Sequence, residues 1–217
     1  MRHCVCVLAT MLLTGTLIVS GCTGTKNQGA TGISPVPEKQ LAYGDVLESW
    51  TQESRLYDGL STKLISKATF KTAAFRQAYA TEYARLYKLE GTEYDKLVAD
   101  QQKEAADYHD FVIAVYVPEK QWDDFSKDTS MWKIYMTRDN VEQIRHLEIR
   151  KLKAKDPITA YFYPYMTTWK SIYLVRFPTI DPKTGNHLTD DLHDAVTLVM
   201  TSVIGSVEFK WEYNRKQ

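Results

Sequence analysis

The densest group of side chains that could do chemistry lies near the carboxyl end of the chain, between His187 and Asp194. It holds two imidazoles and three carboxylates within eight residues, and both groups are common metal ligands. A metal-dependent hydrolase could use His187, His193 and Asp190. The spacing matches no zinc or calcium motif, however, and residues six apart lie on different faces of a helix. We therefore interpret the segment as a polar loop and helix start capped by Thr189, and we expect no bound metal.

Two other polar segments invite a chemical interpretation. Residues 181–186 have the composition of a calcium loop, but Lys183 stands where a carboxylate is needed, so the segment is predicted to be a turn. The pair His109-Asp110 and the single His146 have no Gly-x-Ser-x-Gly segment to complete a catalytic triad. The sequence therefore predicts no catalytic residue and no enzyme activity.

An aromatic stretch is the strongest candidate for a binding surface. It consists of Tyr161, Tyr163 and Tyr165, followed by Trp169. Tyrosine and tryptophan combine a large apolar area with a polar group, so they are enriched at binding surfaces and stack on sugars or lipid. The alternative is that one set of these rings fills the core and the other covers it beneath helices. The stretch thus predicts a lipid- or glycan-binding site, or a core.

The first 22 residues have the pattern of an export signal. Arg2 is followed by a nearly unbroken apolar run over residues 4–19, and the small residues Ser20 and Gly21 precede Cys22. A positive start, an apolar middle and a small-residue end are typical of a secretory signal peptide. The alternative is an uncleaved membrane helix, for which the run is shorter than the roughly 20 residues required.

The end of this segment resembles the lipobox of bacterial lipoproteins, whose pattern is Leu, then Ser or Ala, then Gly or Ala, then Cys. Val19 stands where Leu is usual. The resemblance implies cleavage before Cys22 and acylation of that cysteine, with palmitate among its chains. Two or three acyl chains hold a protein in a bilayer essentially permanently, because each buried methylene contributes about 0.8 kcal/mol. Thr23, rather than Asp, follows the cysteine, which implies the outer membrane and a domain facing the periplasm.

Charge and cysteine content exclude several classes of function. The chain has 27 basic and 27 acidic residues; Arg2 alone precedes Cys22, so 26 basic residues follow it, a net charge of −1. This balance offers no basic surface for nucleic acid. Cys4, Cys6 and Cys22 are the three cysteines of the sequence. The part after Cys22 therefore has no disulfide framework and no cysteine nucleophile, and we expect no cofactor.

Composition divides the chain into three segments. Residues 1–21 are the predicted signal peptide, and residues 22–37 are the acylated cysteine and a flexible tether rich in Gly, Thr, Ser and Pro. Such a tether spans roughly 20 Å. Residues 38–217 are predicted to form a single globular domain, with a helical segment at about 72–108 and a β-rich part at about 109–213.

Hydrophobic periodicity predicts the elements of that domain. Residues 38–57 have helical spacing, and two further helices meet at Gly91 to form a hairpin, the second capped by Thr92. Arg76 and Glu82 lie off the apolar stripe of the hairpin's first helix. The predicted strands cover residues 60–71, 111–117, 131–137, 144–154, 158–165, 171–177, 195–203 and 207–213. The highly charged strand at 144–154 is expected at a sheet edge.

About eight strands with turns between them are typical of a sandwich. We therefore predict a mainly β fold, an antiparallel β-sandwich carrying an α-helical hairpin. Together with the anchor and the balanced charge, this predicts a non-enzymatic envelope lipoprotein. Its expected partners are the membrane, through the lipid on Cys22, and an envelope protein. A lipid- or glycan-binding module is the alternative.

Overall fold

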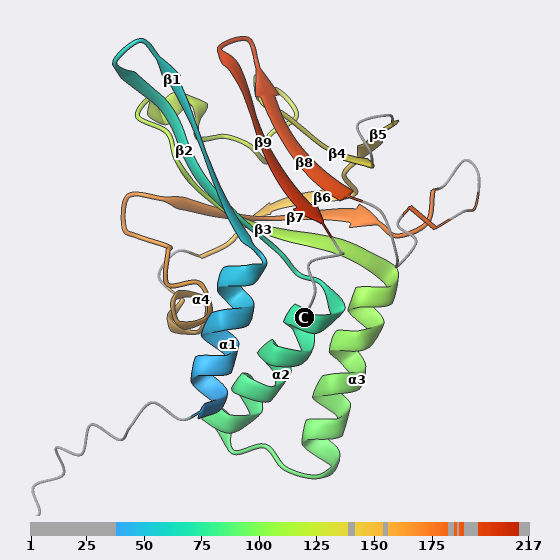
Figure 1. Cartoon of the computed structure of the whole chain (residues 1–217). Helices are drawn as coiled ribbons and strands as arrows, with labels where there is room; N and C mark the ends of the chain where they lie inside the picture. Colours follow the sequence, from blue (N-terminus) through green and yellow to red (C-terminus); the bar gives the residue numbers. More distant parts are fainter. Residues whose placement is uncertain are drawn as a thin grey trace, which may run out of the picture. The chain divides into compact units, whose positions relative to one another are not determined.

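A computed structural model describes residues 38–138, 142–153, 156–181, 185, 187–188 and 195–212 of the chain (Figure 1). All of them belong to one compact unit, Pro35–Gln217. The predicted signal peptide, Cys22, the tether and the predicted helical turn at 189–193 lie outside the described residues. Among the residues described, no helix is both long enough and apolar enough to cross a membrane.

The described residues form four α-helices, a short 3-10 helix (Lys120–Trp122) and nine strands. The α-helices are α1 (Glu38–Ser49), α2 (Ala73–Tyr87), α3 (Thr92–Asp107) and α4 (Pro157–Phe162). The strands are β1 (Thr51–Asp58), β2 (Ser61–Phe70), β3 (Tyr108–Tyr116), β4 (Lys133–Arg138), β5 (Glu142–Arg145), β6 (Glu148–Lys151), β7 (Ser171–Pro178), β8 (Ala195–Ser202) and β9 (Gly205–Glu212).

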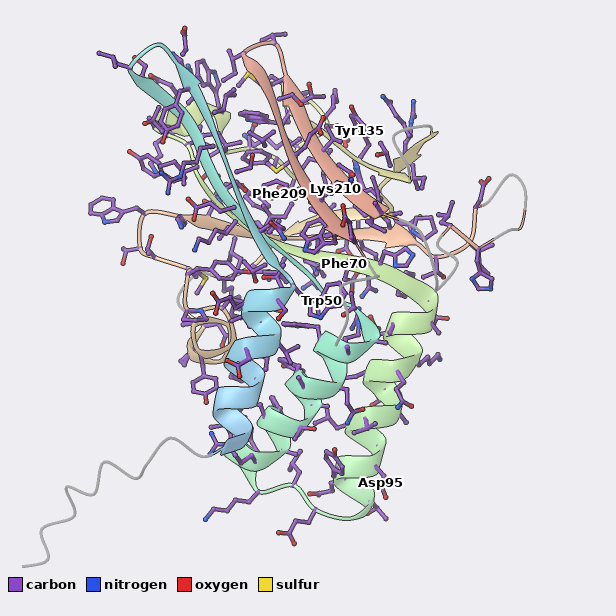
Figure 2. All side chains as sticks on the ribbon, in the orientation of Figure 1. Trp50, Phe70, Asp95, Tyr135, Phe209 and Lys210 are labelled. Atoms are coloured by element: carbon purple, nitrogen blue, oxygen red, sulfur yellow. The ribbon has the colours of Figure 1, made fainter. Side chains whose placement is uncertain are left out.

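The strands form two antiparallel sheets, which confirms the predicted β-sandwich. One sheet has the order β1-β2-β3-β7-β6 and the other β5-β4-β8-β9. Apolar side chains from both sheets meet in one core: the Trp211 ring lies 5.7 Å from the Phe70 ring and 5.2 Å from the Phe111 ring. Figure 2 shows Phe70 and Phe209 within this core.

A helical layer covers the other face of the five-stranded sheet. Tyr43 of α1, Phe75 of α2 and Phe162 of α4 pack there against Val112 and Leu174 of the central strands. The middle of β3 is therefore buried on both faces. This explains why its sequence is a continuous apolar run rather than an alternating one.

The helical hairpin is confirmed, although its turn differs from the prediction. Thr72 caps α2, because its Oγ1 accepts a hydrogen bond from the Phe75 amide at 3.2 Å. The helix then ends at Lys88, which adopts a left-handed conformation (φ 54°), and not at Gly91. Gly91 instead begins α3 with φ 55°, so Thr92 is the first residue of that helix and not its cap.

The predicted helix at 38–57 is wrong in its second half. The helix ends at Ser49, and residues 51–58 form β1 instead. Each of these eight residues has a partner on β2. Leu56 packs against the sandwich core. Long-range pairing thus overrides a local spacing that fits a helix equally well.

The predicted strand at 158–165 is also wrong, because α4 occupies Pro157–Phe162. Asp156 caps this helix: its Oδ2 accepts hydrogen bonds from the Thr159 amide at 2.9 Å and the Thr159 hydroxyl at 2.6 Å. Pro157 stands at the first position, where its missing N–H costs nothing. These two start signals are stronger than the β preference of the aromatic residues.

The predicted single strand at 144–154 is two strands, β5 and β6, in different sheets. The chain changes sheet at His146 and Leu147. His146 Nδ1 lies 3.1 Å from the Ile134 oxygen of β4, and the Leu147 amide donates to the Arg176 oxygen of β7 at 2.7 Å. The expected edge position is confirmed, since each of the two strands is the last of its sheet.

Candidate functional site

The structure separates the four residues of the aromatic stretch. Tyr163 is buried, Tyr161 and Tyr165 are half-buried, and Trp169 is 73% exposed. The ring of Tyr163 stacks on Phe75 of α2 at 6.3 Å. The Tyr165 hydroxyl shares a 2.6 Å hydrogen bond with the Thr69 hydroxyl. Tyr163 therefore belongs to the core between the helices and the sheet, and Tyr161 and Tyr165 pack against that core, whereas Trp169 is not part of it.

Tyr161 is held by a buried carboxylate. Its hydroxyl donates to Glu82, which is fully buried and also accepts two hydrogen bonds from Arg85, at 2.9 and 2.7 Å. Burial, and then the hydrogen bond to Glu82, raises the pKa of Tyr161. This hydroxyl fastens α4 to α2.

A second buried ionic cluster joins the helices to the sheet, and the sequence did not predict it. Asp110 of β3 is fully buried and lies 2.7 Å from Arg76 Nη2 and 2.8 Å from Arg176 Nη2. Arg176 also pairs with Glu104 of α3. Burial by itself would raise the pKa of Asp110, but the Arg176 hydrogen bond and the charges of Lys71, Arg76 and Arg176 outweigh it and lower the pKa.

His109 is not poised for acid–base chemistry. It is buried on the sandwich side of β3, with its ring 5.6 Å from Phe70. Burial, partly opposed by the charge of Asp110, lowers its pKa to about 4. The imidazole is therefore neutral at neutral pH and serves as part of the core.

Of the three residues that a metal-dependent hydrolase could use, the structure describes one. His187 is exposed, whereas Asp190 and His193 fall outside the described residues. Within the part of the chain that the structure describes, no three His, Cys, Asp or Glu side chains are arranged to hold a metal. In the predicted turn at 181–186, the Gly185 amide donates to the Asp181 oxygen at 2.8 Å.

Two hairpin tips carry exposed apolar side chains. Leu60, between β1 and β2, is fully exposed, and Val203, between β8 and β9, is 91% exposed. The hairpins touch: a Cβ added to Gly205 would lie 2.6 Å from Leu56 Cδ1. Figure 1 shows both hairpins extending beyond the rest of the sheets, away from the helices. Exposed apolar side chains at these turns make the tips a candidate contact surface.

An open groove of about 850 Å³ lies where β4, β5 and β6 meet the segment after Phe125. Lys127, Lys133 and Arg145 line it, together with Asp128 and Glu148. Charged side chains of both signs line this groove, and its lining singles out no one class of ligand.

Comparison with known proteins identifies no relative of established function. No family model matches the chain, and no curated protein matches it. A solved structure from Burkholderia pseudomallei K96243, described as a novel protein of unknown function, is similar over 80% of this chain and 83% of its own. The two share 6% sequence identity, with a TM-score of 0.40.

Proposed function

We propose that this protein is a lipid-anchored protein of the bacterial cell envelope, held in the outer membrane by Cys22, whose β domain contacts another envelope protein without catalysing a reaction. The segment Val19-Ser20-Gly21-Cys22 carries the proposal of an anchor. The apolar hairpin tips support the proposal of a protein contact.

The positions of the first turn of α1 and of the hairpin tips fit this arrangement. β1 follows α1 directly, and Figure 1 shows it continuing away from the helices. The eight residues of β1 place the first tip roughly 26 Å beyond the end of α1. The 12 residues of α1 place its start roughly 18 Å in the other direction. A domain tethered through α1 therefore holds Leu60 and Val203 away from its point of attachment.

The anchor is tested by Cys22→Ser. We expect this variant to lose labelling by radioactive palmitate and to move from the membrane to the soluble fraction, because no thiol remains for acylation at that position. Cys6→Ser, in the predicted signal peptide, is the matched control and should be labelled like the unaltered protein. Continued acylation and membrane retention of the Cys22→Ser variant would refute the anchor.

The protein contact is tested by placing a photo-crosslinking amino acid at position 60 or 203 in living cells. We expect both positions to give the same discrete protein adduct, since the two tips would touch one partner. Lys96 and Lys103, exposed on α3, serve as control positions and should not give it. Leu60→Glu should abolish the adduct formed from position 203. Adducts of equal yield from all four positions would contradict the proposal.

A lipid- or glycan-binding module is the second candidate, and the exposure of Trp169 favours it. An exposed indole offers a flat apolar face on which a sugar ring or an acyl chain packs. The crosslinking experiment separates the two candidates. Adducts of lipid or glycan, without protein, would support the module.

A further inference from the structure

A cavity of about 170 Å³ lies between the helical layer and the five-stranded sheet. Val112 of β3 and Leu174 of β7 form its floor, and Phe162 of α4 forms part of its apolar wall. Lys71, Tyr79 and Tyr163 bring polar groups to its lining. The cavity is distinct from the hairpin tips and from the predicted anchor, and a ligand site within it depends on neither.

Strand register places Lys71 on this face of the sheet. Thr69 pairs with Val112, and Val112 with Leu174. Two residues after Thr69, just past the end of β2, Lys71 continues the pairing with β3 by donating its amide to the Asp110 backbone oxygen at 2.8 Å. Because side chains two residues apart in an extended chain lie on the same face, Lys71 lies beneath the helices, beside the apolar floor.

Three polar atoms at the cavity lack partners. Among the described residues, no hydrogen bond or ion pair joins Lys71 Nζ, Tyr79 Oη or Tyr163 Oη to another side chain or to the backbone. Each of the three atoms keeps some contact with solvent. Among the described residues, the side-chain oxygen or nitrogen that is fully buried without a partner is Ser66 Oγ, which does not line the cavity. They are therefore free to bind a group that enters the cavity, which is the usual arrangement of a small-molecule site.

The charges around the cavity favour an anion. Lys71 lies near Arg76 and Arg176, while the two nearby carboxylates, Asp110 and Glu104, are both paired with arginines. The ammonium group of Lys71 is thus left without an ion pair of its own among the described residues. Burial, and then the charge of Arg76, lowers the pKa of Lys71 to about 8, against the pull of Asp110 and Glu104. An anion beside Lys71 would offset this unfavourable environment.

The mouth of the cavity carries a further cation. Arg150 of β6 pairs with Leu174 in the sheet and lines the cavity, and its side chain is 57% exposed. It lies 3.2 Å from Glu148, an exposed pair that an incoming anion can rearrange at little cost. An anionic ligand would therefore meet a positive charge at the entrance and another inside.

We propose that this cavity binds a small organic carboxylate. Its carboxylate oxygens accept hydrogen bonds from Lys71 Nζ and a tyrosine hydroxyl, and its apolar part packs against Val112, Phe162 and Leu174. A cavity of roughly 150 Å³ holds a benzene ring, so a ligand of the size of benzoate fits. The apolar walls disfavour a doubly charged anion such as phosphate, which would lose its hydration without enough donors to replace it.

The probe for this test is benzoate, with benzamide as its uncharged analogue. The full chain is kept in micelles of a non-ionic detergent, and saturation-transfer NMR measures binding to the ring protons. We expect a Kd on the order of 1 mM for so small a ligand, and binding of benzamide at least tenfold weaker. Equal affinity for the two probes, or no transfer at about 10 mM benzoate, would overturn the proposal.

Lys71→Met tests the role of the ammonium group. Methionine keeps most of the volume, so we expect at least a tenfold loss of benzoate affinity with an unchanged or raised melting temperature. Lys67→Met is the matched control. Lys67 lies on β2, four residues before Lys71 and on the same face, but it is paired with Glu53 at 3.3 Å, so this variant should bind benzoate normally. Leu152→Phe, which narrows the cavity while keeping Lys71, should weaken binding independently. Unchanged affinity in both Lys71→Met and Leu152→Phe would refute the site.

The pH dependence gives a further readout that a purely structural lysine would not produce. The charged groups that act on Lys71 are Arg76, Asp110, Glu104 and Arg176. Arg150, Tyr79 and Tyr163 line the cavity, and the charge of Asp156 reaches Tyr79. Benzoate stays ionised above pH 6, so affinity should be constant up to pH 7 and fall roughly tenfold or more by pH 9.5 as the lysine loses its proton. A flat profile over this range would contradict the proposal.

Discussion

Single buried charges decide how the helices are attached to the sheet. Asp110 connects α2, through Arg76, with β7, through Arg176. A carboxylate at a fully buried position is costly unless it is paired, and removing one partner of such a group leaves the other charges uncompensated. The position of Asp110, inside an otherwise apolar strand, is the signal in the sequence that such partners exist.

Asp110→Asn should lower the free energy of unfolding by about 3–5 kcal/mol at pH 7, because Arg76 then loses its counter-charge and Arg176 keeps Glu104 alone. Urea denaturation measures this value. Since folding lowers the pKa of Asp110, its stabilisation is present above the unfolded pKa of about 3.9 and is lost as the pH falls further. The variant should therefore lose part of the acid sensitivity of the parent protein.

Glu53→Gln is the control for this prediction. Glu53 also pairs with two cations, Arg55 and Lys67, but its side chain is 30% exposed. Water screens such a pair, so the substitution should cost about 0–1 kcal/mol. Equal losses in Asp110→Asn and Glu53→Gln would show that burial of the cluster contributes little.

At the scale of elements, the sequence predicted what depends on local pattern and missed what depends on distant partners. The β-sandwich and the hairpin of α2 and α3 were predictable, because their periodic segments are long and turn-forming residues separate them. Residues 51–57 were assigned to a helix because β2, which pairs with them, follows later in the chain. At 158–165, the aromatic residues outweighed the Asp-Pro start signal of α4 in the prediction.

The candidate sites follow the same division. The aromatic stretch drew attention to Tyr163. Its ring stacks on Phe75 of α2 and it lines the cavity, and both features depend on how the chain folds. Lys71 is the last residue of the predicted strand at 60–71, and nothing in the sequence indicates that α2 folds back over it. The cluster of Arg76, Asp110 and Arg176 was missed because its members are separated by 34 and 66 residues.

At the scale of the whole domain, the edge strands β1 and β9 of the two sheets lie in contact with each other. Gly205 of β9 has φ 137°, a conformation that other residues rarely adopt, and its open side lies against Leu56 of β1. Gly205→Ala should therefore destabilise the domain twice, through backbone strain of about 1–3 kcal/mol and through a clash with Leu56. Because the clash involves the end of a flexible side chain, it should be relieved when that side chain is shortened.

Gly205→Ala, Leu56→Ala and the double variant form a cycle that separates strain from clash. We expect urea denaturation to give a coupling free energy of about 0.5–3 kcal/mol, with the double variant more stable than the sum of the single losses predicts. Gly59→Ala is the control, with φ 58° but no atom within 4 Å of the added Cβ, and should cost about 1 kcal/mol through strain alone. If the loss of unfolding free energy in the double variant equalled the sum of the two single losses, Gly205 and Leu56 would not be in close contact. The two hairpin tips would then not be held together as one contact surface.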